Sequence, residues 1–175
     1  YFDAFSVPVL KGKGDSLKVS AFSPDGNVPT ATTQFEKRGI SDKISSWIKE
    51  NCIQCNQCAF VCPHACIRPI LLEDKQNIPD AFETIDAIQP KGQYFRLQIS
   101  PRDCTGCGSC INTCPAPKKA LEYKPLESEK VLQKDNWEFA KNHENSKEVI
   151  NKKQVKGVGF ARQLFEFSGA CSGCG

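Results

Sequence analysis

Cys52-Ile53-Gln54-Cys55-Asn56-Gln57-Cys58-Ala59-Phe60-Val61-Cys62-Pro63 is the stretch that decides the fold, because its cysteine pattern returns once in the chain. The second copy reads Cys104-Thr105-Gly106-Cys107-Gly108-Ser109-Cys110-Ile111-Asn112-Thr113-Cys114-Pro115, and both copies have the spacing C-x2-C-x2-C-x3-C-P. Cysteine thiolates are soft ligands that select iron–sulfur clusters, zinc or copper(I). The repeat therefore predicts two inorganic centres in one chain.

The spacing is that of bacterial ferredoxins with two clusters, in which the fourth cysteine of each run ligates the cluster of the other run. On that pattern one [4Fe–4S] cluster is held by Cys52, Cys55, Cys58 and Cys114, and the other by Cys104, Cys107, Cys110 and Cys62. A proline follows each fourth cysteine, where it removes a backbone donor and pushes the cysteine toward extended geometry. Extended geometry suits a side chain that leaves its own loop for a neighbouring cluster.

Two other interpretations of the cysteines are a structural zinc module that mediates assembly and a disulfide framework. Structural zinc sites usually present C-x2-C pairs that close four ligands around one ion, and two runs of four that end in Cys-Pro fit this poorly. The chain has 11 cysteines, an odd number, which argues against full pairing in disulfides. Iron–sulfur clusters remain the favoured prediction.

The two cysteine loops differ in the residues between the ligands. The second loop has Gly106 and Gly108, which permit positive φ and leave bare amide groups near sulfur, whereas the first loop has side-chain amides at Gln54 and Asn56. Hydrogen bonds to sulfur and solvent exposure tune cluster potentials. We therefore expect the two clusters to have unequal potentials.

Composition limits the classes of partner. The chain has 175 residues with 39% apolar residues and a formal net charge of +3, and two oxidised clusters with their ligands bring it to about −1. No nucleic-acid partner is expected, since the lysine-rich stretch 141–156 also carries glutamates and lacks aromatic residues, as a solvated surface does. No apolar run approaches the ~18 residues that span a bilayer, so no membrane partner is expected.

The hydrophobic pattern predicts an α+β fold of the two-cluster bacterial-ferredoxin type, in which strand, cluster loop, helical turn and strand occur twice with pseudo-symmetry. Three strands flank the loops, at 67–72, 94–99 and 120–123. Residues 17–22 predict a further short strand, followed by a turn at 24–27. Ile44, Trp47 and Ile48 stand at helical spacing after a possible cap, a short signal that the adjacent loop can override.

Four regions are expected along the chain, with loop-rich extensions at both ends. They are an N-terminal region at 1–40, the two-cluster domain at 41–125, a linker or peripheral wrap at 126–157, and the start of another domain at 158–175. Between the cysteine runs lies a polar insertion, 73–91, which we expect on the outside or against a larger protein. The chain begins at Tyr1, contains no methionine and stops within a cysteine motif, so we expect it to be part of a longer polypeptide.

Three cysteines lie outside the runs. Cys171 and Cys174 form one C-x2-C pair, which on spacing alone is half of a metal or cluster site, a redox dithiol or two free thiols. Cys66 belongs to neither run and is expected to be a buried or free thiol without a ligand role. His64, Arg68 and Arg102 are expected to place positive charge near the clusters. No catalytic acid, base or nucleophile is expected.

Several stretches together resemble pyruvate:ferredoxin (or flavodoxin) oxidoreductase, a thiamine-dependent 2-oxoacid enzyme. Beyond the cysteine runs, the specific matches are Thr33-Gln34-Phe35-Glu36-Lys37-Arg38-Gly39 and Phe165-Glu166-Phe167-Ser168-Gly169-Ala170-Cys171. The resemblance extends over most of the chain, from about Val19 to Gly175. A two-cluster domain of another oxidoreductase, such as a hydrogenase or a different 2-oxoacid enzyme, is the alternative, and the last two stretches argue against it.

The resemblance implies a function. The family decarboxylates pyruvate oxidatively with coenzyme A to acetyl-CoA and CO2, and electrons leave through a proximal cluster and two ferredoxin-like clusters to ferredoxin or flavodoxin. By this match Cys171 and Cys174 are half the ligands of the proximal [4Fe–4S] cluster and open a thiamine-binding domain. Thiamine diphosphate, Mg²⁺ and the third cluster then belong to the full-length enzyme, implied to be a homodimer. It would be cytoplasmic in an anaerobic bacterium, or cytosolic or hydrogenosomal in an anaerobic eukaryote.

Overall fold

The structure is a computed structural model, and it describes residues 1–163 and 166–167. The strands are β1 (Lys43–Trp47), β2 (Ile67–Leu72), β3 (Ile85–Asp86), β4 (Tyr94–Ile99) and β5 (Leu121–Pro125). The α-helices are α1 (Val7–Leu10), α2 (Gln57–Phe60), α3 (Ser109–Thr113), α4 (Leu126–Leu132), α5 (Lys134–Asn142) and α6 (Val155–Gly159). The other helical turns are a π-turn η1 (Phe2–Ser6) and the 3-10 turns η2 (Gly14–Ser16), η3 (Val19–Ala21), η4 (Thr32–Gln34), η5 (Lys49–Asn51) and η6 (Lys147–Val149).

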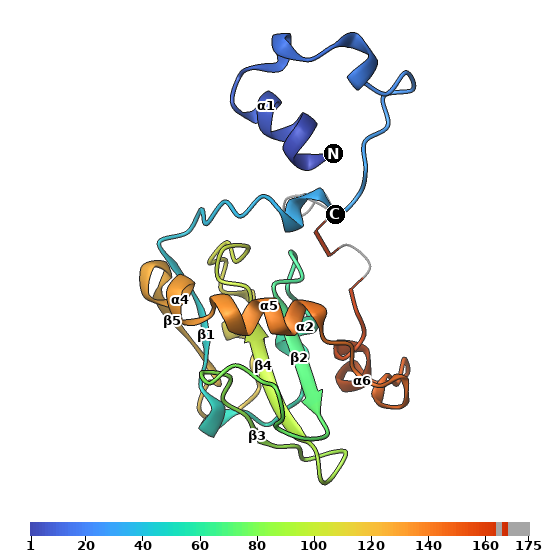
Figure 1. Cartoon of the computed structure of the whole chain (residues 1–175). Coiled ribbons are helices and arrows are strands. Elements are labelled where there is room, and N and C mark those ends of the chain that lie inside the picture. Colours follow the sequence, from blue (N-terminus) through green and yellow to red (C-terminus); the bar gives the residue numbers. More distant parts are fainter. Residues whose placement is uncertain (164–165, 168–175) are drawn as a thin grey trace.

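Two small antiparallel sheets carry the cysteine loops (Figure 1). In the first sheet β1 pairs with β5, from Lys43 opposite Pro125 to Trp47 opposite Leu121. In the second the order is β2-β4-β3, and β2 pairs with β4 from Ile67 opposite Ile99 to Leu72 opposite Tyr94. The first loop runs from the end of β1 to β2, and the second runs from the end of β4 to β5, so each loop joins one sheet to the other.

The strands that flank the loops confirm most of the sequence prediction. Strands β2 and β4 have the predicted bounds, and β5 begins one residue later than predicted. The predicted turn at 24–27 forms, and its Gly26 N–H donates to the Ser23 carbonyl at 3.0 Å.

Two local predictions are wrong. Residues 17–22 form the 3-10 turn η3 instead of a strand, and Val19 there is 89% exposed, so no neighbouring strand covers it. Residues 43–47 form strand β1 instead of a helix. Pairing with β5 and burial of Ile44, Ser45 and Ser46 outweigh the short helical spacing, since tertiary contacts override weak local propensity.

Strand β4 is buried on both faces. Phe95, Leu97 and Ile99 lie on the face toward the cysteine loops. On the other face the buried Arg96 and Gln98 side chains both donate to the Gln133 Oε1 atom, at 3.0 and 3.2 Å, at the junction of α4 and α5. The polar residues of β4 are therefore satisfied by hydrogen bonds beneath these helices.

The segment expected as a linker or wrap contains α4, α5 and α6. Helix α5 crosses the β2-β4-β3 sheet (Figure 1), and its Trp137 and Ala140 pack into a core cluster with Ile70, Leu72 and Phe82. Phe82 belongs to the polar insertion, whose strand β3 extends the sheet. Both segments thus contribute buried apolar residues to the fold, although Ile88 and Val131 remain exposed.

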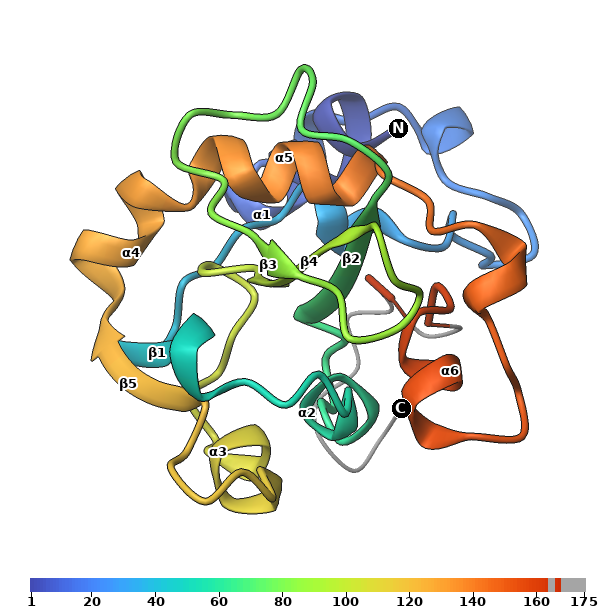
Figure 2. The same ribbon diagram turned by 90° about the horizontal axis from the view of Figure 1, so that it is seen from below.

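Helices α2 and α3 each contain the third cysteine of a run, Cys58 and Cys110, and they contact each other. Figure 2 shows both short helices on the side of the strands opposite the N-terminal segment. No helix of the described residues is long and apolar enough to cross a bilayer.

Candidate iron–sulfur site

The first cysteine loop encloses a cavity with one wall from the other run. Four cysteines line it, Cys52, Cys55, Cys58 and Cys114, and the remaining walls come mainly from Phe95, Leu97 and Leu121. The space free of protein atoms there, including the part that opens to solvent, is about 330 Å³. The first three cysteines of one run and the fourth of the other thus converge on one space.

The second cysteine loop encloses an equivalent cavity. It is lined by Cys104, Cys107, Cys110 and Cys62, together with a fifth cysteine, Cys66, and the cavity again measures about 330 Å³. Thiol sulfur lines both spaces at the same four positions of the repeat. Two spaces of equal size are what two copies of one cofactor require.

The two cysteine loops have positive φ at the same two positions, but different residue types occupy these positions. Gln54 and Asn56 in the first loop have φ of 56° and 59°, and Gly106 and Gly108 at the matching positions have 66° and 80°. A side chain at Gly106 would collide with Ser41 and with the Lys43 carbonyl, so space as well as φ favours glycine there. At Gly108 a side chain would meet only the hydroxyl end of the exposed Tyr123 side chain, so the positive φ is the main reason for glycine.

In the first loop, the side-chain amides of Gln54 and Asn56 stabilise the positive-φ backbone through hydrogen bonds to neighbouring segments. The Gln54 side chain donates to the Asp86 carbonyl and accepts from the Ile88 N–H group, both at 2.8 Å. The Asn56 side chain donates to the Lys156 carbonyl at 2.8 Å. The insertion and helix α6 therefore hold the first loop in shape, while the second loop relies on its glycines.

The fourth cysteine of each run accepts a backbone hydrogen bond from the residue just ahead of the next strand. The Cys66 N–H donates to Cys62 Sγ at 3.3 Å, and the Ala120 N–H donates to Cys114 Sγ at 3.5 Å. Cys66 and Ala120 thus hold equivalent positions in the two halves. Cys66 is buried, which confirms its expected burial, and its lack of a ligand role stays a prediction.

Polar groups near the cavities fit anionic clusters. The buried indole Nε1 of Trp47 has no hydrogen-bond partner within the described residues and lies beside Cys52. Burial raises the pKa of Cys52, and the indole N–H group partly opposes that rise. The Ser45 hydroxyl group lies 3.0 Å from Cys110 Sγ. Donors directed at cysteine sulfur support thiolates and cluster sulfides, so these residues fit a [4Fe–4S] group in each cavity.

Burial and hydrogen bonds set the ionisation of the thiols. Desolvation raises the pKa of Cys58, Cys104 and Cys110, so these residues are protonated in the metal-free chain. A hydrogen bond from Cys66 lowers the pKa of Cys62 to about 6, and the same contact raises that of Cys66. Deprotonation of the buried thiols must therefore accompany metal binding.

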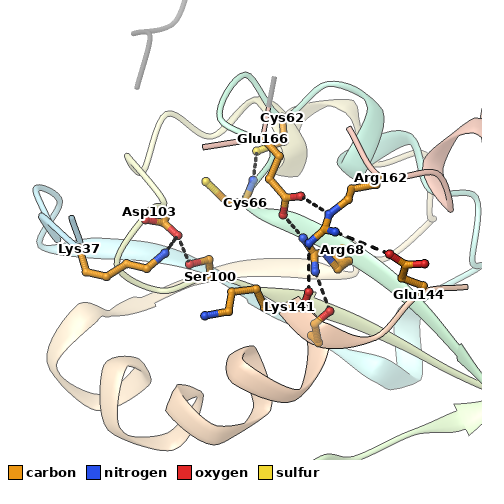
Figure 3. A network of polar contacts seen from close by, with 11 residues as sticks. Lys37, Cys62, Cys66, Arg68, Ser100, Asp103, Lys141, Glu144, Arg162 and Glu166 are labelled. Atoms are coloured by element: carbon orange, nitrogen blue, oxygen red, sulfur yellow. Dashed lines mark hydrogen bonds and ion pairs between the residues drawn. The ribbon is translucent and has the colours of Figure 1, made fainter. Parts of the chain in front are cut away.

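Several other predicted residues have different surroundings. Arg68 lines neither cysteine cavity, because it forms an ion pair with Glu166 and donates to the Ala140 carbonyl at 2.7 Å (Figure 3). His64 lines the second cavity, and the proximity of Arg68 and Arg102 to a cluster stays a prediction. Cys171 and Cys174 lie outside the described residues. Among residues 1–163 and 166–167, which the structure describes, no three cysteine, histidine or acidic residues are arranged to hold a single metal ion.

Two family models match separate parts of the chain. A 4Fe-4S dicluster domain matches residues 51–118, which contain both cysteine runs, and a domain of unknown function called EKR matches residues 5–41. Residues 51–118 and the two cysteine-lined cavities define an iron–sulfur dicluster domain of ferredoxin type.

Relatives match the chain along almost its full length. Pyruvate:ferredoxin oxidoreductase of Moorella thermoacetica is 51% identical over 172 residues, which are 96% of this chain and 15% of the relative. Pyruvate-flavodoxin oxidoreductase of Enterobacter agglomerans is 44% identical over 97% of this chain and 15% of the relative. The NADP⁺-linked mitochondrial pyruvate dehydrogenase of Euglena gracilis is 44% identical over 100% of this chain and 10% of the relative.

The chain is similar along almost its full length to one segment of pyruvate:ferredoxin and pyruvate-flavodoxin oxidoreductases, which confirms the resemblance seen in its motifs. It spans about 15% of the length of the first two of these relatives.

Proposed function

We propose that this chain is the two-cluster electron-transfer segment of a pyruvate:ferredoxin (or flavodoxin) oxidoreductase. The observation that carries the proposal is the pair of equal cavities, each lined by three cysteines of one run and the fourth of the other. One [4Fe–4S] cluster would be held by Cys52, Cys55, Cys58 and Cys114, and the other by Cys104, Cys107, Cys110 and Cys62. Bound there, the clusters supply one-electron transfer.

The chain's own residues hold these ligands and keep water from them. Phe95, Leu97 and Leu121 close the first cavity, and Ile67 contributes to the second. The backbone donors of Cys66 and Ala120 orient the fourth cysteines across the boundary between the runs. No proton transfer or nucleophilic attack is assigned to a residue of this chain.

The proposal includes a pseudo-symmetric fold, supported by three correspondences between the halves. Each loop has residues of positive φ at matching positions, and each leads into a short helix that contacts the helix of the other half. In each half, the backbone N–H group just before the next strand donates to the sulfur of the fourth cysteine. The two-cluster domain would extend over 41–125, with 1–40 as the N-terminal region, 126–157 as a wrap and 158–175 as the start of the next domain.

The full-length enzyme would oxidise pyruvate with coenzyme A, using thiamine diphosphate and Mg²⁺ bound elsewhere. Cys171 and Cys174 would supply half of a third, proximal [4Fe–4S] site. The remainder of the polypeptide would be the permanent partner, in a homodimer within the cytoplasm of an anaerobe or a eukaryotic cytosol or hydrogenosome.

The terminal acceptor would be ferredoxin or flavodoxin. Relatives named for ferredoxin, flavodoxin and NADP⁺ share this segment at 44–51% identity, so the segment itself does not distinguish the acceptors.

Electron delivery to a carrier tests the function. The chain, reconstituted with iron and sulfide without oxygen and then reduced chemically, is mixed with oxidised flavodoxin while the flavin absorbance is followed. We expect rapid reduction of flavodoxin by about two electrons per chain, one from each cluster. The same chain loaded with zinc is the control and should transfer none. Clusters that remain reduced in the presence of flavodoxin or ferredoxin would contradict the proposal.

A further inference from the structure

The three charged residues of the Glu-Lys-Arg stretch in the N-terminal region lie in different surroundings. Glu36 and Arg38 pair with each other, and the Arg38 side chain is 64% exposed. Lys37 points inward instead, and its Nζ lies 2.5 Å from Asp103 Oδ2, with both side chains only 17% exposed (Figure 3). One residue of the stretch thus reaches the second cysteine loop, 66 positions along the chain.

The contact joins two segments by several bonds. The Ser100 hydroxyl group donates to the same Asp103 oxygen at 2.5 Å. Next to Asp103, the Arg102 side chain donates to the Lys37 carbonyl, and the Gly39 N–H donates to the Arg102 carbonyl at 2.9 Å. Backbone and side-chain bonds therefore fix Lys37 against the residue that precedes Cys104.

Aromatic rings flank the ammonium group on other sides. Lys37 Nζ lies 5.7 Å from the centre of the Trp137 ring and 5.1 Å from that of Phe167. Charges removed from water in this way are screened much less than exposed ones. Both members of the pair are therefore able to influence a charge that changes in the adjoining cavity.

Among the described residues, only the second loop has a buried ion pair at the residue before its first cysteine. The residue before Cys104 is Asp103, whereas the residue before Cys52 is the neutral Asn51, whose side chain donates to the Lys119 carbonyl at 2.9 Å. A carboxylate beside the first ligand opposes the negative charge that reduction adds, and a paired ammonium group offsets it.

We propose that the Glu-Lys-Arg segment sets the reduction potential of the second-loop cluster, with Lys37 acting as a positioning residue that neutralises and fixes Asp103. This assigns a role to a region that matches a domain of unknown function. The inference depends on the proposed function, because it requires a cluster on Cys104, Cys107, Cys110 and Cys62. It predicts that loss of the Lys37 charge and loss of the Asp103 charge shift the reduction potential of this cluster in opposite directions.

The test is an EPR-monitored redox titration of the reconstituted chain, with iron content measured in parallel. The signal of the second-loop cluster is identified by its loss in Cys62→Ala. Lys37→Met is expected to lower the reduced-to-oxidised ratio of this cluster about tenfold at the wild-type midpoint, equivalent to about 59 mV for one electron. Asp103→Asn should raise it, and the double variant should return toward the wild type.

The first-loop cluster is the internal reference, and its midpoint should not move. Arg38→Gln is the matched control, since it removes the same charge one residue away from an exposed side chain, and it should shift neither midpoint. If Lys37→Met does not retain the second cluster, the midpoint of Asp103→Asn tests the proposal instead, because asparagine keeps the size of the side chain. A midpoint that rises supports the proposal, and an unchanged or lowered midpoint contradicts it.

Three results would overturn the inference while leaving the proposed function intact. They are unchanged midpoints with both clusters present, shifts of the same sign in Lys37→Met and Asp103→Asn, and an equal shift in Arg38→Gln. A wild-type chain that binds no iron and sulfide would instead refute the proposed function, and the role of Lys37 with it.

Discussion

Cys114→Ala is expected to remove the cluster of the first loop, although Cys114 belongs to the second run. Its side chain lines the cavity formed by Cys52, Cys55 and Cys58, so its loss leaves that cluster with three protein ligands. Iron should fall from about eight to about four atoms per chain, four for each cluster. The EPR spectrum of the reduced chain should lose the features of two interacting clusters.

Second substitutions identify the surviving cluster. In the Cys114→Ala background, Cys110→Ala should remove the remaining iron, whereas Cys58→Ala should change nothing further. The reverse pattern would show that each run ligates its own cluster and would refute the crossed assignment.

Cys66→Ala is the matched control for the loss of a thiol at a cavity wall. Cys66 lines the second cavity and holds the position that Ala120 occupies in the other half. Alanine already serves at that equivalent position, so this variant should keep about eight irons per chain. Loss of iron from Cys66→Ala would give Cys66 a ligand role that the proposed assignment denies it.

Phe95→Ala is expected to cause the largest loss of stability among single core substitutions. Phe95 is fully buried, lines the first cavity, and packs edge-on against Trp47 and Phe160 at centroid distances of 6.1 and 6.3 Å. Truncation of a buried phenylalanine costs about 3–5 kcal/mol, since the transfer energy is lost and a cavity remains. Anaerobic urea unfolding measures this loss, and bleaching of the first cluster in air should accelerate.

Phe60→Ala provides the control for Phe95→Ala. Phe60 is 58% exposed on helix α2, beside the first loop, so its removal should change stability by less than about 0.5 kcal/mol. Equal losses in the two variants would show that Phe95 does not seal the cavity as the structure indicates.

Sequence patterns predicted the elements that local chemistry determines. The apolar run at 67–72 and the alternation over 94–99 correspond to β2 and β4, and Ile67, Leu71, Phe95, Leu97 and Ile99 of these strands pack with the cysteine loops. Cysteine spacing also predicted which residues meet, since the two cavities bring together the eight expected cysteines.

Elements that depend on distant partners were missed. Strand β1 is specified by its pairing with β5 across about eighty residues rather than by its own sequence. Helix α5 is polar overall, and the only signal of its burial is the helical spacing of Trp137 and Ala140. The Lys37–Asp103 contact has no local signature, because it joins segments 66 residues apart.

The first measurement to make is the content of iron, acid-labile sulfide and zinc per chain after anaerobic purification, with an EPR spectrum of the reduced protein. Two [4Fe–4S] clusters predict about eight irons, about eight sulfides and two magnetically interacting signals. Stoichiometric zinc without sulfide, in a colourless protein, would contradict the electron-transfer account and leave a structural metal module.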